Sequence, residues 1–479
     1  MVPTPTTAPE APPAAAAGDG SAGAILRRQA ARESAARTYP RALPVVPVRA
    51  RGMTVEAADG RRYLDCLSGA GTLALGHNHP AVIAAIRAVL DSGAPLHALD
   101  LATPAKDAFT DALFEVLPPA LAADCKVQFC GPAGTDAVEA ALKLARTATG
   151  RRGVLAFTGA YHGHTAGALG ASGDVAVREP VEDAAAAAVR LPFPYDYRCP
   201  FGIGGERGAE LGARLAESLL DDPKGGVLPP AAMLLEPVQG EGGAVPAPDG
   251  WLRRMREITA ARGIPLVVDE VQTGVGRTGA YWAVEHAGIT PDVMVLSKAI
   301  GGSLPLAVVV YRAGLDVWRP GAHAGTFRGN QLAMAAGAAT LRIVREERLP
   351  SRAAELGERM LGRLRELERR FPCVGDVRGR GLMLGIEFVD PEGEAGPSGA
   401  LPAAPETAAA VQRACLERGL ILETGGRHGA VARLLPPLTM TDTQCEAVLD
   451  RLADAVQAVA RGVRAVPVPG GGRGEGAAP

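Results

Sequence analysis

Two short apolar segments, each followed by polar residues, constrain the fold of this chain more than any other feature. Pro265–Val268 and Val293–Leu296 are rich in β-branched residues and too short for helices, so we expect both to be buried strands. Asp269 follows the first segment directly, and Lys298 comes two residues after the second. Because ligands bind at the strand ends of an open parallel sheet, an acid and a lysine are expected at one ligand-binding edge.

The combination of Asp269 and Lys298 indicates a cofactor chemistry. A buried lysine is costly unless it is used, whereas a lysine joined to an aldehyde as a Schiff base is no longer a free cation. Pyridoxal phosphate (PLP) requires such a lysine, with an Asp facing its pyridinium nitrogen. An arbitrary Asp can also cap a turn and an arbitrary Lys can be solvated, so the surrounding residues must decide between these interpretations.

A second segment contains a turn suited to a phosphate group. Lys126–Cys130 is expected to be a strand, and the run GTDAVEAALKLAR after it a helix capped by Thr135 or Asp136. Unpaired amides at a helix start bind anions, so Gly134 and Thr135 are candidate phosphate ligands. No GK[ST] follows the turn, which disfavours binding of a nucleotide triphosphate.

Aromatic and acidic residues follow two further predicted strands. Tyr161 comes after Gly153–Phe157 and before a glycine, a position that suits a ring stacked on a flat cofactor, although a core tyrosine is an equal alternative. His162 is expected to support Tyr161. Glu236 and Glu241 lie in a Gly-rich turn at another strand end, where they either approach the cofactor or are solvated.

The residues around these positions resemble one family over long stretches. DEVQTGVGRTG and SKAIGG resemble the cofactor-binding core of the class III, or ornithine-type, aminotransferases, and GPAGTDAVEAALKLAR resembles their phosphate-binding turn. The resemblance implies an α/β protein of PLP-dependent transferase fold type I. A large domain with a mostly parallel seven-stranded sheet is joined by a small α/β domain built from both chain ends. The expected boundaries are a disordered extension (1–23), the N-terminal part of the small domain (24–75), the large domain (76–335), the C-terminal small domain (336–465) and a disordered tail (466–479).

The resemblance also implies the residues that hold the cofactor. Lys298 is the Schiff-base lysine, Asp269 keeps the pyridine nitrogen protonated, and Gln272 donates to the phenolic oxygen. The family places a threonine on the phosphate of the neighbouring subunit's cofactor, and Thr326 matches it, so a homodimer is implied. The expected cofactor-binding set is Gly134, Thr135, Tyr161, His162, Glu236, Asp269, Gln272, Lys298 and Thr326.

Three further residues match substrate-binding positions of the family. Glu241 matches the glutamate that pairs with a distant arginine, and Arg433 matches that arginine, which otherwise holds the α-carboxylate of glutamate. Tyr39 matches a substrate-facing tyrosine. His164 stands where ornithine enzymes carry an arginine, so the residue that holds the distal carboxylate of glutamate is not predicted.

Within the class, ESAARTYPRALP and HAGTFRGNQLAMAAG resemble a subgroup with a defined reaction. This subgroup converts L-glutamate and L-aspartate 4-semialdehyde to 2-oxoglutarate and L-2,4-diaminobutyrate. Ornithine, acetylornithine and 4-aminobutyrate remain alternative amines. An aminomutase or epimerase of the same fold, and a non-catalytic vitamin B6-binding protein, are alternatives from other classes.

Charge and cysteine content limit the partners and the compartment. The net charge of −2 offers no basic excess for nucleic acid or an anionic membrane, and no apolar run is long enough to span a bilayer. The seven cysteines are scattered without a CxxC pair, and the N-terminus lacks a signal peptide, so a cytoplasmic protein is expected. His77 and His79 are expected to be turn residues, and no metal site is predicted.

Overall fold

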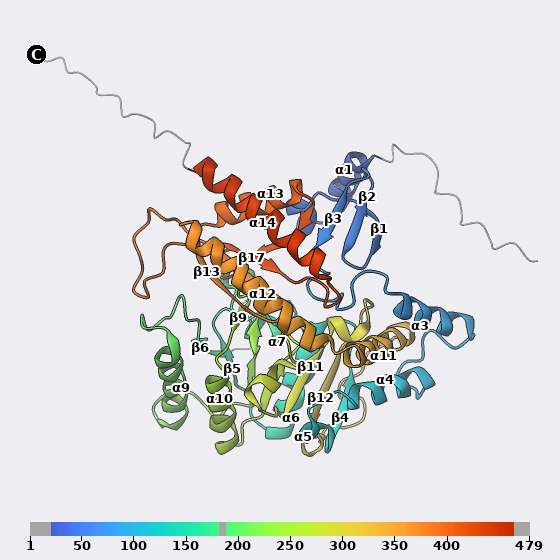
Figure 1. Cartoon of the computed structure of the whole chain (residues 1–479). Coiled ribbons are helices and arrows are strands. Elements are labelled where there is room, and N and C mark those ends of the chain that lie inside the picture. The colour runs from blue at the N-terminus through green and yellow to red at the C-terminus, as the bar shows by residue number, and fades with distance from the viewer. Residues whose placement is uncertain (1–20, 182–187, 464–479) are drawn as a thin grey trace, which may run out of the picture.

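A seven-stranded sheet lies at the centre of the lower tier of the molecule in Figure 1, a computed structural model that describes residues 21–181 and 188–463. The strand order is β4-β12-β11-β10-β7-β5-β6. Only β12 runs antiparallel to its neighbours, which confirms the predicted mostly parallel sheet. The strands are β4 (Cys125–Phe129), β5 (Val154–Phe157), β6 (Ala188–Leu191), β7 (Ala232–Leu235), β10 (Leu266–Asp269), β11 (Val293–Leu296) and β12 (Val308–Arg312).

The central strands are buried on both faces, as their continuous apolar sequences require. Side chains alternate along a strand, so Val267 enters one core with α6 and α7, whereas Leu266 and Val268 enter the other with α4, α10 and α11. Each fully buried side chain of this size contributes about 1.5–3 kcal/mol to folding. The covering helices are α4 (Pro104–Phe114), α6 (Gly134–Thr149), α7 (Ala166–Ala171), α10 (Asp249–Ala261) and α11 (Gln331–Glu346).

Both ends of the chain build the upper tier (Figure 1), where blue N-terminal and orange-red C-terminal segments lie together above the large sheet. Its first sheet has the order β1-β2-β3-β15, and β15 pairs in parallel with β3 through Leu420 and Leu64. This pairing joins segments more than 300 residues apart, as the predicted small domain requires. The strands are β1 (Pro47–Arg51), β2 (Thr54–Ala57), β3 (Arg62–Asp65) and β15 (Leu420–Ile421).

A second sheet of the upper tier carries residues that reach the large domain. It has the order β13-β14-β17-β16 and is antiparallel throughout. Its strands are β13 (Val374–Arg380), β14 (Met383–Phe388), β16 (Glu423–Gly425) and β17 (Val431–Leu434), and its helices are α12 (Leu349–Arg370), α13 (Pro405–Glu417) and α14 (Asp442–Val463). The other described elements are α1 (Ala22–Arg32), α2 (Tyr39–Ala42), α3 (Pro80–Asp91), α5 (Pro119–Ala122), α8 (Val175–Arg178), α9 (Gly205–Asp221), β8 (Val238–Gln239) and β9 (Val245–Pro246), with 3₁₀ turns at Glu179–Val181, Ala283–Ala287, Lys298–Gly301 and Ala313–Leu315.

Two local predictions need correction. Helix α1 begins at Ala22, inside the range expected to be a disordered extension. It begins there because the Ser21 side chain accepts a hydrogen bond from the Ala24 amide and caps the helix. The rest of the predicted extension, residues 1–20, and the tail from 464 lie outside the described residues. Helix α6 begins at Gly134 after the uncapped Ala133, so neither Thr135 nor Asp136 is its cap. The Asp136 carboxylate instead accepts from the Gly131 amide and so closes the preceding turn. None of the helices in the described ranges is long and apolar enough to cross a membrane.

Candidate active site

A cavity of about 300 Å³ lies at the carboxyl ends of β7, β10 and β11. It brings together most of the predicted site residues, although they come from five separate stretches of the chain. Because these three strands are parallel and adjacent, the residue that follows each one meets the others at one sheet edge. The predicted residues that line it are Gly134, Thr135, Tyr161, His162, Glu236, Glu241, Asp269, Gln272 and Lys298.

Lys298 combines a strained backbone with a free amine. Its φ of +50° is in the left-handed region, which a non-glycine residue adopts at a cost that functional sites often carry. Within the described chain its ammonium forms no hydrogen bond or ion pair, and burial lowers the pKa of Lys298. A lysine in this state is suited to act as a nucleophile.

Asp269 is oriented by a buried histidine. Its Oδ2 lies 2.8 Å from Nδ1 of His162, and its Oδ1 accepts from the Val271 amide at 3.0 Å. Burial opposes a charge on His162, but the hydrogen bond to Asp269 and its negative charge outweigh this, so the pKa of His162 is raised. His162 therefore supports Asp269 directly, whereas the sequence predicted support for Tyr161.

Glu236 holds two loops of the site together. One of its carboxylate oxygens accepts from the Tyr161 amide at 3.0 Å and the other from the Gly240 amide at 2.9 Å. Burial raises the pKa of Glu236 to about 7. Glu236 thus fixes the backbone that carries Tyr161.

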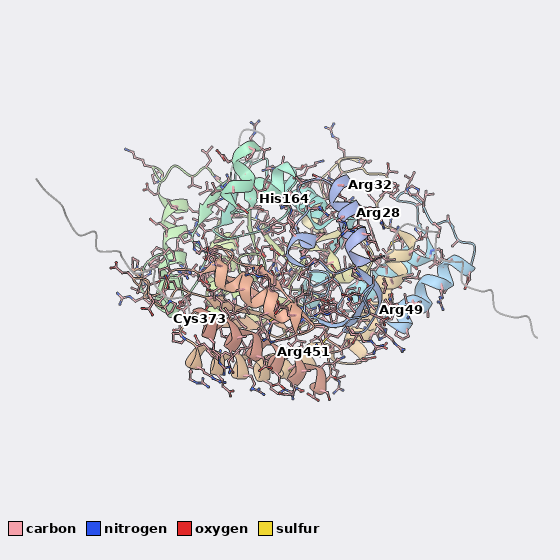
Figure 2. The ribbon with its side chains drawn as sticks, turned by 90° about the horizontal axis from the view of Figure 1, so that it is seen from above. Arg28, Arg32, Arg49, His164, Cys373 and Arg451 are labelled. Atoms are coloured by element: carbon pink, nitrogen blue, oxygen red, sulfur yellow. The ribbon has the colours of Figure 1, made fainter. Side chains whose placement is uncertain are left out.

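Tyr161 is open to the cavity, which removes the alternative of a core tyrosine. Its side chain is 39% exposed and lines both the 300 Å³ cavity and a larger adjoining cavity. Its ring centroid lies 5.5 Å from that of His164, which the view from above shows in the same half of the molecule as Arg28 and Arg32 of α1 (Figure 2). The exposed ring face is available to a flat ligand.

The start of α6 forms an anion-binding end of the cavity. Gly134 and Thr135 lie in the first turn of the helix, and Thr135 Oγ1 lies 2.7 Å from Thr165 Oγ1. Gly163 has a φ of +121°, and a Cβ there would collide with the Thr135 side chain. The loop that carries Gly163 therefore packs directly against the first turn of α6, and a helix start of this kind suits an anion.

Two buried polar atoms of the site have no partner among the described residues. They are Oε1 of Gln272 and Nε2 of His162. The Nε2 atom of the Gln272 side chain donates to the Ala70 carbonyl at 3.0 Å, which fixes the amide at the cavity wall. Together with the free lysine, the oriented Asp269 and the helix start, these atoms fit a planar cofactor with polar substituents and a phosphate.

Arg433 lies behind the cavity and is shared by two carboxylates. Its Nη1 and Nη2 donate to the two oxygens of Glu241, both at 2.8 Å, and Nη2 forms an ion pair with Glu423 at 2.7 Å. Burial opposes ionisation of Glu241, but Arg433 lowers its pKa; burial raises the pKa of Glu423. Tyr39 Oη donates to Glu423 at 2.8 Å. The structure thus brings Glu241 and Arg433 together, as predicted. Glu423 is a second acid at Arg433, and the sequence did not indicate it.

Thr326 lies outside the cavity of its own chain. It is exposed, and its carbonyl oxygen lies 2.9 Å from Nε2 of His97. Contact with a second subunit's cofactor stays a prediction.

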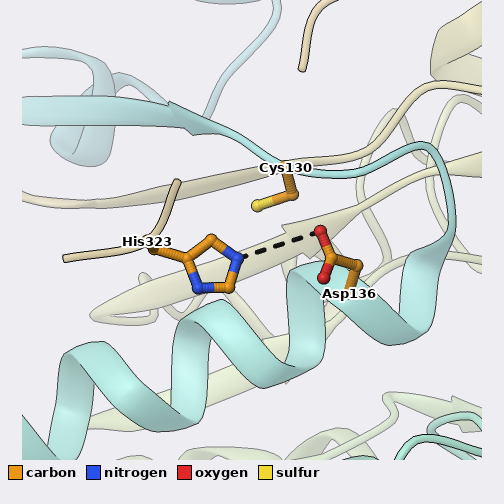
Figure 3. A group of neighbouring side chains, drawn as sticks. All are labelled: Cys130, Asp136 and His323. Carbon is orange, nitrogen blue, oxygen red and sulfur yellow. Dashed lines mark ion pairs between the residues drawn. The ribbon is translucent and has the colours of Figure 1, made fainter. Parts of the chain in front are cut away.

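The structure also brings together metal-ligating residue types that the sequence did not indicate. Cys130, Asp136 and His323 have ligand atoms within 4.8 Å of one another (Figure 3). Burial raises the pKa of Cys130 and lowers the pKa of His323, so the thiol stays protonated, and Asp136 already serves the Gly131 turn. We interpret the three side chains as a packing contact at the start of α6 and not as a metal site. His77, expected above to be a turn residue, has its Nε2 2.8 Å from Oδ2 of Asp65.

Comparison with known proteins identifies the family. Residues 35–456 match the family model described as aminotransferase class III, and the chain belongs to this family, whose members use PLP. The chain is 56% identical to the diaminobutyrate–2-oxoglutarate aminotransferase of Rhizobium meliloti, over 91% of this chain and 93% of that protein. It is 50% identical to the enzyme of the same name from Haemophilus influenzae, over 90% and 94% of the two chains.

Solved structures agree with this assignment. The (S)-enantioselective omega-transaminase from Thermomicrobium roseum is 30% identical, with a TM-score of 0.80 over 91% of this chain and 98% of that one. The ornithine aminotransferase from Toxoplasma gondii is 26% identical, with a TM-score of 0.76 over 92% and 96%. The predicted fold type is therefore confirmed.

Proposed function

We propose that this chain transfers the amino group of L-glutamate to L-aspartate 4-semialdehyde, giving 2-oxoglutarate and L-2,4-diaminobutyrate in a reversible reaction. The observation that carries the proposal is the Glu241–Arg433 pair beside the cavity of Lys298. The names of the relatives at 50% and 56% identity support the same substrates.

The residues of the site divide the binding of PLP between them. The first amides of α6, at Gly134 and Thr135, would hold the phosphate, and Tyr161 would cover the ring. Asp269 would face the pyridine nitrogen, and Gln272 the phenolic oxygen. We further propose a homodimer in which the partner subunit's Thr326 completes the phosphate site. When bound, PLP supplies an electron-withdrawing ring that stabilises negative charge at the reacting carbon of the substrate.

Lys298 is the proton carrier in this proposal. Burial lowers the pKa of Lys298, which favours its neutral amine, and this amine can take the proton from the reacting carbon of the substrate and hold it at Nζ for return. Asp269, held by His162, lines the cavity where it would face the pyridine nitrogen. The ring of Tyr161 shields the reacting atoms from water.

The two amino donors have opposite requirements near Lys298. Glutamate reacts at its α-amine and needs a cation for the adjacent carboxylate, whereas diaminobutyrate reacts at a terminal amine that has no carboxylate beside it. Arg433 can meet the first requirement when Glu241 moves away, and Glu241 can cover Arg433 for the second. We propose that Glu241 acts as this gate.

A cytoplasmic location belongs to the same proposal. All seven cysteines are free, as expected in a reducing compartment. No helix of the described residues is long and apolar enough to span a membrane, and this finding is compatible with the proposal.

The test is an absorbance spectrum of the PLP-loaded protein, with L-glutamate or L-2,4-diaminobutyrate added separately. We expect both donors to bleach the visible band of the bound cofactor and 2-oxoglutarate to restore it. The Lys298→Ala variant is the control and should show neither change. Bleaching by glutamate but not by diaminobutyrate would refute the proposed amine, and rates with ornithine, acetylornithine and 4-aminobutyrate would then identify another. No bleaching by either donor would refute transamination by this chain.

A further inference from the structure

The turn between β16 and β17 places an arginine at the wall of the substrate cavity. A cavity of about 980 Å³ adjoins the cofactor cavity and is lined by Tyr39, Glu241, Lys298 and Arg427, among others. Arg427 is the only arginine in its lining as far as the structure describes the chain. One hairpin therefore carries two arginines of the site, with Arg433 on β17 and Arg427 in the turn.

The guanidinium of Arg427 has incomplete bonding. Its Nη2 donates to the Thr158 carbonyl at 3.1 Å and to Gln239 Oε1 at 3.3 Å, both neutral acceptors. Its Nε is buried without a partner, and Nη1 donates to no residue of the described ranges. No carboxylate in those ranges lies within ion-pair distance of it. Burial lowers the pKa of Arg427.

The neighbouring Arg378 has the carboxylate partners that Arg427 lacks among the described residues. Arg378 forms ion pairs with Asp376 at 2.6 Å and with Glu387 at 2.8 Å. Both arginines lie over the ring of Tyr195. The distance to the ring centroid is 4.8 Å from Cζ of Arg378 and 5.0 Å from Cζ of Arg427. A largely buried cation without an anion is costly, so the missing anion of Arg427 is expected to come from a ligand of the cavity.

The proposed substrates supply such an anion. L-Glutamate carries a γ-carboxylate, and L-2,4-diaminobutyrate and aspartate 4-semialdehyde carry an α-carboxylate, in each case at the end away from the reacting group. Arg433 can take only the carboxylate next to the reacting amine.

We propose that Arg427 binds the distal carboxylate of both substrates. The inference rests on the proposed function and adds the residue that selects substrates with a far carboxylate. The turn is well placed for this, because the Gly426 amide donates to the Glu241 carbonyl at 3.0 Å and so ties the Arg427 loop to the gate. The Nη1 group of Arg427, which is not among the buried unpartnered atoms and has no partner in the described ranges, also suits a carboxylate oxygen.

The test compares ligands that carry a distal carboxylate with ligands that lack it. Glutarate and butyrate are titrated into the PLP-loaded enzyme by calorimetry, and half-reaction rates are measured for glutamate against alanine and for diaminobutyrate against 1,3-diaminopropane. Arg427→Gln should weaken glutarate binding roughly 30-fold, the effect of losing charge-assisted hydrogen bonds, and lower kcat/KM for glutamate and diaminobutyrate by a similar factor. Butyrate, alanine and 1,3-diaminopropane should change less than about twofold.

The matched control is Arg413→Gln, which removes an exposed arginine of α13 that has no partner among the described residues, and it should leave all values unchanged. Equal losses for ligands with and without the distal carboxylate would overturn the proposal. If Arg427→Gln does not fold, Arg427→Lys replaces it, and a loss of glutarate affinity below about twofold then overturns the proposal. If the wild type rejects diaminobutyrate, the proposed reaction fails, while the glutarate and butyrate comparison still decides the role of Arg427.

Discussion

Replacing Glu241 with alanine should separate the two half-reactions of the proposed enzyme. In the proposed gate of the wild type, the α-carboxylate of glutamate would displace Glu241 from Arg433, so two hydrogen bonds at 2.8 Å would be broken while two would be formed. The net free-energy change of this exchange is near zero. In Glu241→Ala the new bonds form without any being broken, so glutamate should bind more tightly.

The structure sets the size of the effect. A hydrogen bond between charged groups contributes about 1.5–3 kcal/mol. The Glu241 side chain is 36% exposed, and Arg433 keeps Glu423 at 2.7 Å, so we take the low end and expect a gain of about 1–2 kcal/mol, or roughly 5–30-fold in kcat/KM for glutamate. The terminal ammonium of diaminobutyrate would meet an uncovered guanidinium. Two like charges about 5 Å apart repel by roughly 3 kcal/mol at an effective dielectric constant of about 20. Because Glu423 cancels part of this, the expected loss is also about 1–2 kcal/mol.

The assay is stopped-flow absorbance of the PLP-loaded enzyme with each amino donor alone. The ratio of the two kcat/KM values should shift toward glutamate by roughly 100-fold. Glu241→Gln keeps the side-chain volume but removes its charge, and should shift the ratio in the same direction. Equal losses in both half-reactions would refute the gate, because they would indicate a general disturbance of the site.

The remaining predictions concern stability and cofactor retention. Glu270 is buried, and burial raises the pKa of its carboxyl from the ordinary 4.5 to about 7. The folded state therefore prefers the protonated form, so its contribution is complete below about pH 4.5 and is lost as the pH rises through 7. In urea unfolding at different pH values, Glu270→Gln should remove up to about 3 kcal/mol of the pH dependence of the unfolding free energy. The control Glu358→Gln, at an exposed position, should follow the wild type. If the unfolding free energies of Glu270→Gln and wild type change in parallel with pH, the prediction is contradicted. Gly163→Ala places a Cβ against Thr135 and should weaken PLP retention on dialysis by at least about tenfold, whereas Gly362→Ala, with open space around it, should not. Unchanged retention in Gly163→Ala would show that this turn does not hold the phosphate.

Much of the large domain could be predicted because its signals are local. The β-branched composition of Val293–Leu296 predicts a buried strand, and the structure has the strand at these residues. The positions of Asp269 and Lys298 after two such strands predict their meeting, because adjacent parallel strands end at one edge. The predicted caps of α6, Thr135 and Asp136, lie two and three residues after its actual cap position, Ala133, because Asp136 closes the turn before the helix instead.

Contacts between distant segments required the tertiary structure. The sequence by itself determined the strands, the lysine and acid at their ends, and the family that these residues resemble. It did not indicate that Arg433 is shared with Glu423, since that contact depends on the register of the β16–β17 hairpin. Nor did it indicate that Arg427 lines the substrate cavity without a carboxylate partner among the described residues. An arginine that follows two glycines has the same local sequence whether it faces solvent or a ligand, and only the packing of the two tiers decides which charge it meets.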